Sequence, residues 1–320
     1  MFEAAFSEMG YKVNVVTYFD FMKTQRNYDY ILSDEIQDFP PSVLRAMNAR
    51  AKHVVVAGDS NQSIYEIAPR IREATVTPSQ INQLLSSREF ELNIIHRLST
   101  SIKNIVQKFL PRINIFSGRI DPTKVDTQVR LCEANSRDEE VKYIIREGEK
   151  ANNVGQTVGI LIPTHSDILD FFQRVLRLKN KNTWDVQLDN YGNPNYDALN
   201  HYLYSVGIPI QYVGNRFGNF SDDNRKITVM TYHSSKGLDF DNVFIPFLNN
   251  SLFIVSDETL SKTLFMVAMT RSRRNLYLTY NGYKHAYLNN FASDCHKIDI
   301  HDALSIQQPK FDGGSVFAGF

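Results

Sequence analysis

Residues 28–38 run a short apolar stretch directly into three carboxylates and a glutamine. A second apolar, β-branched run at residues 53–57 leads in the same way into Gly58 and a polar segment. Buried parallel strands present their polar residues at their carboxyl ends, and parallel sheets bind ligands in the crevice at that edge. The two segments therefore predict neighbouring strands whose ends carry Asp34 and Glu35 towards a nucleotide and its metal ion.

Short β-branched runs alternate with segments of helical period along the whole chain. We predict strands over residues 13–17, 30–33, 54–57, 129–131, 158–162, 227–231, 243–246 and 276–279. Helix starts are indicated at residues 40–42 and 136–140, and a further helix over 257–270. This alternation is typical of βαβ units, so an α/β fold with parallel sheets is expected.

The length of the chain favours two domains. Its 320 residues and 36.8 kDa exceed a typical single domain. Residues 117–122 form a polar stretch with Gly and Pro that is typical of a hinge. We expect a first domain over 1–90, a linking region over 91–121 and a second domain over 122–320. Turn-forming residues at 180–195 predict an excursion from the second sheet.

The composition is that of an ordinary globular protein. Lys and Arg together number 35, as do Asp and Glu, so the formal net charge is zero and any nucleic-acid site must be local. Cys132 and Cys295 form no metal-ligand or disulfide pattern, which favours a reducing cytoplasm. The first residues are acidic where a signal peptide is basic, and no apolar run approaches the roughly 18 residues of a membrane span.

Five segments in a fixed order resemble the motifs of the UvrD/Rep/PcrA family of superfamily 1 helicases. Residues 34–38 are similar to motif II, 58–65 to motif III and 92–100 to motif IV. Residues 227–241 are similar to motif V, and residues 267–274 to motif VI. The resemblance covers most of the chain, and five ordered motifs are a far more specific signal than any one of them.

The resemblance implies two RecA-like domains with parallel sheets, which is the P-loop NTPase fold. It further implies an ATP-dependent helicase or translocase that moves 3′ to 5′, with ATP and Mg²⁺ between the domains. Single-stranded DNA, or a junction of single and double strand, would be the substrate. A monomer is expected, with a loading protein as a further partner, at work in the cytoplasm.

Phosphoryl transfer to water needs a metal, a group that activates water, and cations for the developing charge. By the resemblance, Asp34 with Glu35 beside it holds Mg²⁺, and Glu35 is also the general base. Gln62 matches the sensor of the γ-phosphate or water, and Arg97 and Arg271 match the two arginine fingers. The alternatives are structural: an Asp-Glu pair in a solvated turn, a helix-capping Gln62, and surface arginines.

The remaining predicted site residues belong to motifs III and V. Gly237 permits close approach of the backbone to a ligand, and Asp239 would bind the ribose hydroxyl. Tyr65, Thr231 and His233 occupy positions that touch DNA in the family, with Tyr65 the best candidate for base stacking. A buried structural Tyr65 and a His233 that only links motif V to the nucleotide site are the alternatives.

The chain departs from the family in several places. It contains no Gly-x-x-x-x-Gly-Lys-Ser/Thr phosphate loop, so we expect a truncated first domain and no ATP turnover by this chain alone. The alternative is a non-catalytic DNA-binding or regulatory module derived from a helicase. Asp239 replaces the usual glutamate, and His96 the usual motif IV tyrosine. The family's aromatic and Arg-Gly-Ala run after Tyr65 is also missing, which puts one stacking platform in doubt.

Overall fold

The computed structural model describes residues 6–59, 63, 68, 71–90, 94–111, 118–214, 217–218 and 227–306. The chain divides into two compact units, Met1–Glu91 and Leu92–Phe320, and each is described by itself. Asp34 and Glu35 belong to the first unit, and the segments similar to motifs V and VI belong to the second. Gln62 and Tyr65 lie outside the described residues.

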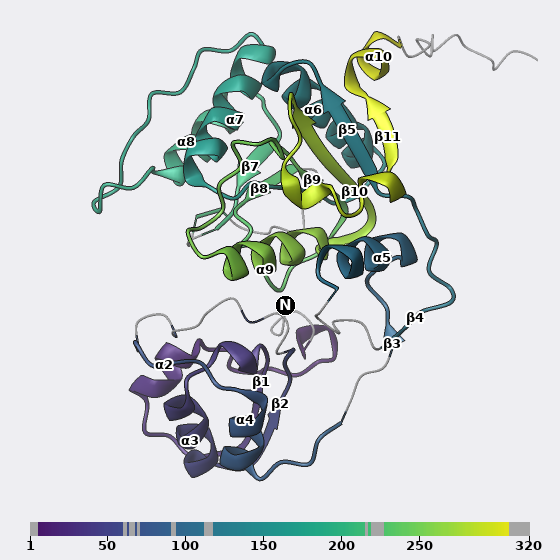
Figure 1. Ribbon diagram of the computed structural model, residues 1–320. Coiled ribbons are helices and arrows are strands. Elements are labelled where there is room, and N and C mark those ends of the chain that lie inside the picture. Colours follow the sequence, from purple (N-terminus) through teal and green to yellow (C-terminus); the bar gives the residue numbers. More distant parts are fainter. Residues whose placement is uncertain are drawn as a thin grey trace, which may run out of the picture. The chain divides into compact units, whose positions relative to one another are not determined.

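The first unit contains a two-stranded parallel sheet with helices (Figure 1). Its described elements are α2 (Tyr18–Lys23), β1 (Tyr28–Ser33), η1 (Ile36–Asp38), α3 (Pro41–Arg50), β2 (Ala51–Val56) and α4 (Pro78–Leu85). Val43 and Met47 on α3 pack with Phe21 of α2, and Leu44 packs with Ile36 and Val76. Helix α3 therefore supplies residues to both small cores of this unit.

One face of this small sheet is solvent-exposed although its side chains are apolar. Tyr30, Leu32 and Val55 are 65%, 52% and 56% exposed. Tyr30 stacks on His53 of the neighbouring strand, with ring centroids 4.7 Å apart. Parallel sheets are ordinarily covered on both faces, and here the described helices cover only one.

The second unit is built on a seven-stranded sheet in which every pairing is parallel, in the order β11-β5-β10-β9-β6-β8-β7. A separate short parallel pair joins β3 (Ile94–Ile95) and β4 (Arg119–Ile120). The large sheet contains β5 (Arg130–Ala134), β6 (Val158–Leu161), β7 (Ile210–Tyr212), β8 (Ile227–Met230), β9 (Phe240–Ile245), β10 (Ser272–Asn281) and β11 (His296–Asp299). The remaining elements are α5 (Thr100–Phe109), α6 (Arg137–Asn153), α7 (His165–Leu178), α8 (Tyr196–Ser205), α9 (Glu258–Met269), η3 (Ala286–Leu288), η4 (Ala292–Asp294) and α10 (Ile300–Ser305).

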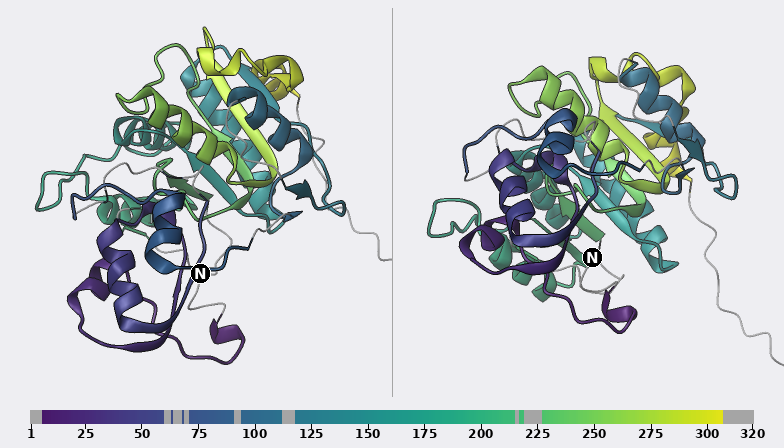
Figure 2. Two further views of the ribbon diagram at one scale, coloured as in Figure 1. Left: turned by 60° about the horizontal axis from the view of Figure 1, so that its bottom comes forward. Right: turned by 90° about the horizontal axis from the view of Figure 1, so that it is seen from below.

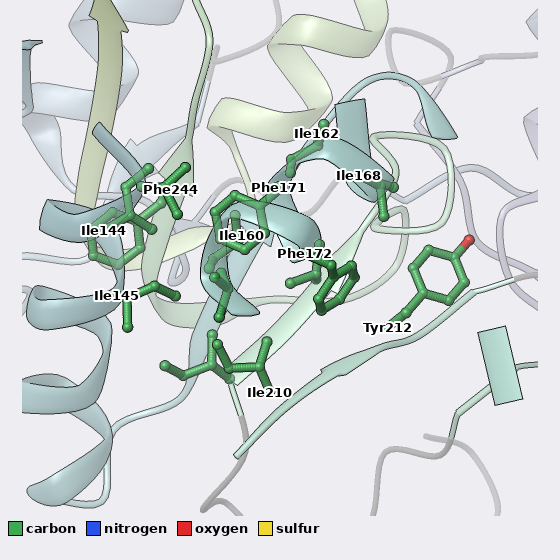
Figure 3. Close-up of a cluster of buried hydrophobic side chains, with 14 of the residues drawn as sticks. Ile144, Ile145, Ile160, Ile162, Ile168, Phe171, Phe172, Ile210, Tyr212 and Phe244 are labelled. Atoms are coloured by element: carbon green, nitrogen blue, oxygen red, sulfur yellow. The ribbon is translucent and has the colours of Figure 1, made fainter. Parts of the chain in front are cut away.

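Helices cover both faces of the large sheet. Helices α6 and α7 lie on one face, and α5 and α9 lie on the other (Figures 1 and 2). Figure 3 shows Ile144 of α6 and Phe171 of α7 packing around Ile160 of β6. On the opposite face Phe109 of α5 makes an edge contact with Phe265 of α9, at 5.2 Å between ring centroids. This two-sided cover explains why all four residues of β6 and of β8 are buried.

The predicted α/β fold with parallel strands is confirmed, and seven of the eight predicted strands are present. The predicted helix starts are also confirmed: Pro41 occupies the first turn of α3, Ser136 caps α6 and Asp257 caps α9. The strand predicted over residues 13–17 is wrong, because this segment is irregular and ends in Thr17, whose side chain caps α2. Strands β3, β4, β7 and β11 were missed, since all are short. No helix among the described residues is long and apolar enough to cross a membrane.

Candidate nucleotide and nucleic-acid sites

In the first unit, Asp34 and Glu35 directly follow β1. Glu35 has a left-handed backbone, with φ 55°, and accepts a hydrogen bond from the Gln37 amide. Gln37 also accepts a hydrogen bond from the backbone N–H of Asp59 at 3.1 Å, which joins the end of β1 to the segment after β2. A Cβ at Gly58 would lie 2.7 Å from Cγ2 of Ile36, so this close approach requires glycine. The two predicted strand ends therefore do meet.

In the second unit, the segment similar to motif V connects two strands that are not neighbours in the sheet, since β6 lies between β8 and β9. Residues 231–239 leave the carboxyl end of β8 and enter the amino end of β9. Because all strands are parallel, this connection must run from one edge of the sheet to the other. Thr231 and His233 thus lie near the carboxyl edge, and Gly237 and Asp239 near the amino edge.

Hydrogen bonds fix the start of this connection. Thr231 Oγ1 accepts a hydrogen bond from the backbone N–H of Ser234 at 3.1 Å, and its carbonyl accepts one from Ser235 N at 3.1 Å. Thr231 is 6% exposed. His233 is half-buried, and burial lowers its pKa, so the imidazole is neutral near pH 7. Gly237 has φ +78°, a backbone conformation that favours glycine.

Arg271 is a buried side chain, only 1% exposed, at the end of α9. Its Nε donates to the carbonyl of Val267 at 3.0 Å, and its Nη1 donates to the carbonyl of Leu238 at 3.2 Å. Its Nη2 donates to Thr270 Oγ1 at 3.1 Å. Arg271 thereby ties motif VI to the far end of motif V, and a phosphate could reach this guanidinium only if some of these bonds opened.

Asp239 is paired with Arg273, whose pKa is raised by this hydrogen bond. Lys124 lies in the same cluster, and its pKa is lowered first by burial and then by Arg273 and Arg274. A nearby anion stabilises the charged form of a lysine whose ammonium group is disfavoured by neighbouring arginines. At the amino edge of β9 and β10, Lys124, Arg273 and Arg274 lie among the carboxylates of Asp121, Asp239 and Asp241, and the two arginines pair with Asp239 and Asp241.

The segment similar to motif IV contacts this cluster through Lys124, whose ammonium group donates to the carbonyl of His96 at 3.2 Å. His96 pairs with Asp121 at 2.8 Å. Hydrogen bonds from the hydroxyl and the backbone N–H of Thr123, and then His96, lower the pKa of Asp121 to about 2. Arg97 is half-buried beside His96. The structure thus brings motif IV next to the ends of motifs V and VI.

Sequence reasoning missed Lys124, which lies in none of the five motifs. It also did not predict that Arg273 would pair with Asp239. No local pattern could have shown either contact. More than 30 residues separate Asp239 from Arg273, and more than 100 residues separate Asp239 from Lys124. The described residues contain no group of three or more His, Cys, Asp or Glu side chains that could hold a metal ion. Asp34 would have to share a Mg²⁺ with phosphate oxygens and water, as this ion commonly requires.

Comparisons with known proteins agree with the order of the motifs. Residues 208–283 match the UvrD-like helicase C-terminal domain family. A putative ATP-dependent DNA helicase of Acanthamoeba polyphaga mimivirus is 23% identical over 319 residues, which cover 93% of this chain. The chain spans 40% of the length of that relative.

A solved structure, the C-terminal domain of a possible DNA helicase from Lactobacillus plantarum, aligns with 64% of this chain and 98% of its own length. Its sequence identity is 14% and the TM-score is 0.40, so this likeness adds nothing to the fold assignment. The family match is the stronger finding. Residues 208–283 of the second unit are similar to the UvrD-like helicase C-terminal domain, and the predicted resemblance to UvrD-like superfamily 1 helicases is confirmed.

Proposed function

We propose that this chain is the motor body of an ATP-dependent DNA helicase or translocase that moves 3′ to 5′ on single-stranded DNA. One observation carries the proposal: residues 231–239 join the two edges of the second sheet and are tied to motif VI by the bond from Arg271 to Leu238. A single hydrogen-bonded connection thus links the residues proposed for DNA to those proposed for the nucleotide. Coupling of this kind is what a nucleotide-driven motor needs.

On the nucleotide side, Arg97, Arg271, Gly237 and Asp239 are the proposed contacts of the second unit. Asp34 would hold Mg²⁺ with Glu35 beside it, and Glu35 would orient or deprotonate the attacking water. When bound, Mg²⁺ would supply charge stabilisation to the phosphate oxygens. Gln62 is proposed as the sensor of the γ-phosphate.

On the DNA side, Thr231, His233 and Tyr65 are the proposed contacts. His233 is neutral near pH 7, so it would hydrogen-bond or stack rather than act as a fixed positive charge. Because the formal net charge of the chain is zero, the positive charge that would bind DNA phosphates is proposed to lie in local patches. A monomer, a loading protein and a cytoplasmic setting complete the proposal.

The second candidate is a non-catalytic DNA-binding or regulatory module. It is favoured by the absence of a phosphate-loop sequence anywhere in the 320 residues. In both readings the chain binds single strands without hydrolysing ATP by itself. They differ in whether a further segment supplies the loop, and an in-frame phosphate loop in the coding sequence upstream of Met1 would decide for the motor.

DNA binding is tested by fluorescence anisotropy of a labelled single strand with the 320-residue chain. We expect binding that weakens steeply between about 50 and 200 mM salt, because phosphate contacts release counterions. His233→Ala should weaken binding while leaving the melting temperature unchanged, whereas Tyr204→Ala, on the surface of α8, should change neither. No binding at low salt would refute the proposed function, and DNA-stimulated ATP turnover by this chain would refute its dependence on an added phosphate loop.

A further inference from the structure

Two loops at the carboxyl edge of the second sheet are held together by backbone hydrogen bonds. They are residues 246–256 after β9 and residues 282–285 after β10. Asn250 N donates to the carbonyl of Tyr283 at 2.9 Å, and His285 N donates to that of Leu248 at 2.8 Å. Asn249 and Lys284 form an antiparallel bridge. The side chains on these loops are therefore displayed from a fixed backbone.

Glu140 anchors the bases of both loops. This fully buried carboxyl group on α6 accepts hydrogen bonds from Phe247 N at 2.7 Å and from Asn281 Nδ2 at 2.7 Å. It also accepts one from the Thr279 hydroxyl at 2.5 Å. Phe247 has a left-handed backbone, with φ 65°, so the first loop turns sharply at the point where Glu140 holds it.

The loops present two large aromatic side chains to solvent. Tyr283 is 83% exposed and Phe253 is 60% exposed. Lys284 follows Tyr283 and is exposed, and the two loops carry no carboxylate. We call Phe253, Tyr283 and Lys284 the aromatic rim. Exposed aromatic faces beside a cation are the usual means of binding single-stranded nucleic acid without reading its sequence.

A cavity of about 630 Å³ adjoins the aromatic rim and is lined in part by Gly282, Tyr283 and Lys284. Its volume lies in the usual range of small-ligand sites. Lys297 of β11 adds a second ammonium group, and among the described residues neither Lys284 nor Lys297 is paired with a carboxylate. Two carboxylates also face the cavity: Glu133, which accepts a hydrogen bond from the Tyr280 hydroxyl at 2.8 Å, and Asp299, which caps α10.

We propose that the aromatic rim and its cavity bind nucleotides of the same DNA single strand that passes Thr231 and His233. This inference rests on the proposed DNA-binding function. Strands β8 and β10 are three positions apart in the sheet, about 14 Å at ordinary strand spacing. Bases stack on Tyr283 and Phe253, phosphates meet Lys284 and Lys297, and Glu133 or Asp299 accepts from a base amino group.

The test measures the affinity of the 320-residue chain for labelled DNA single strands of increasing length. Tyr283→Ala should not change the affinity for the shortest strands that bind. It should weaken the affinity for longer strands by about 5- to 150-fold, the equivalent of one lost stacking contact. His233→Ala should weaken short and long strands alike. Tyr283→Phe keeps the ring and should restore affinity, and Lys284→Gln should lower the salt dependence by about one counterion.

The matched control is Tyr191→Ala, which removes a tyrosine that is 90% exposed but lies on the 180–195 excursion. It should bind DNA of every length as the unaltered chain does. If the unaltered chain binds long strands and Tyr283→Ala binds them equally well, this inference fails and the proposed function stands. If the unaltered chain binds no single strand, both fail. If free mononucleotide binds with a free energy equal to the binding free energy gained by lengthening the strand, the cavity is a site for a small ligand and the proposal is overturned.

Discussion

The two units use the same strand chemistry with very different amounts of cover. In the second unit, β6 and β8 are buried at every residue between helices on both faces. In the first unit, three of the six residues of β1 and three of the six residues of β2 are exposed, including Leu32 and Val55. Glu35 after β1 is nevertheless held by Gln37, which also accepts a hydrogen bond from Asp59 N beside Gly58. Local strand-end geometry can therefore form with one covered face, whereas burial of both faces requires a complete layer on each side.

The largest expected effect comes from Glu140→Ala in the second unit. The substitution leaves Phe247 N, Thr279 and Asn281 without their shared acceptor inside the core. We expect a loss of about 3–5 kcal/mol in the free energy of unfolding, because buried donors would remain unsatisfied. Trp184, the single tryptophan, is 5% exposed in the core of this unit, so its fluorescence reports the loss during denaturant unfolding.

Glu149→Ala is the matched control, since Glu149 lies on the same helix and pairs with Lys179 near the surface. This substitution should change the free energy of unfolding by less than about 1 kcal/mol. Equal effects of the two substitutions would show that Glu140 is solvated in solution.

A smaller effect distinguishes the covered sheet from the half-covered one directly. Val229 in β8 is fully buried, and Val55 in β2 is 56% exposed, although both lie in parallel strands. Val229→Thr should lower the free energy of unfolding by about 1–3 kcal/mol because it buries a hydroxyl group. Val55→Thr should change it by no more than about 0.5 kcal/mol. Urea unfolding followed by Trp184 fluorescence for Val229→Thr, and by far-ultraviolet circular dichroism for both, measures the difference.

A large loss for Val55→Thr would mean that the exposed face of β1 and β2 is covered in solution. The two units would then not differ in how their sheets are covered. A negligible loss for Val229→Thr would instead require a hydrogen-bond partner for the new hydroxyl inside the second core.

The strands of both units were predictable because apolar, β-branched runs mark buried parallel strands wherever they form. The segment at 13–17 shows the limit of this reasoning: it has the residues of a strand but no described strand pairs with it. Strands β7 and β11 are set at the edges of the sheet by neighbours distant in sequence, with Ile210 opposite Ile227 and His296 opposite Arg130. Edge strands of three or four residues leave too short a pattern to recognise.

In the candidate sites, motif order predicted which segments carry the site residues, and it did not predict their contacts. Motif order placed Thr231, Gly237 and Arg271 in one unit, but it could not show that Arg271 is buried under the carbonyl of Leu238. The pairing of Asp239 with Arg273 and the approach of Lys124 depend on packing between distant segments. Glu140 gave no signal at all, because a glutamate on a helix ordinarily faces solvent.

The smallest expected effect is a pH dependence confined to the second unit. His165, His233 and His285 all lie there, and burial lowers the pKa of each below the ordinary value of 6.5. The unfolded chain therefore binds protons more readily, so their contribution is complete above about pH 6.5 and is lost as the pH falls below it. Exposed His301 has the opposite sign, because Glu139 raises its pKa, and its contribution is lost only as the pH rises above 6.5. Denaturant unfolding followed by Trp184 between about pH 7 and pH 5.5 should show a falling free energy, and His233→Gln should make that fall shallower. If the free energy of unfolding rises as the pH falls through this window, these imidazoles are solvated. The second unit would then lack the buried histidines that set it apart from the first.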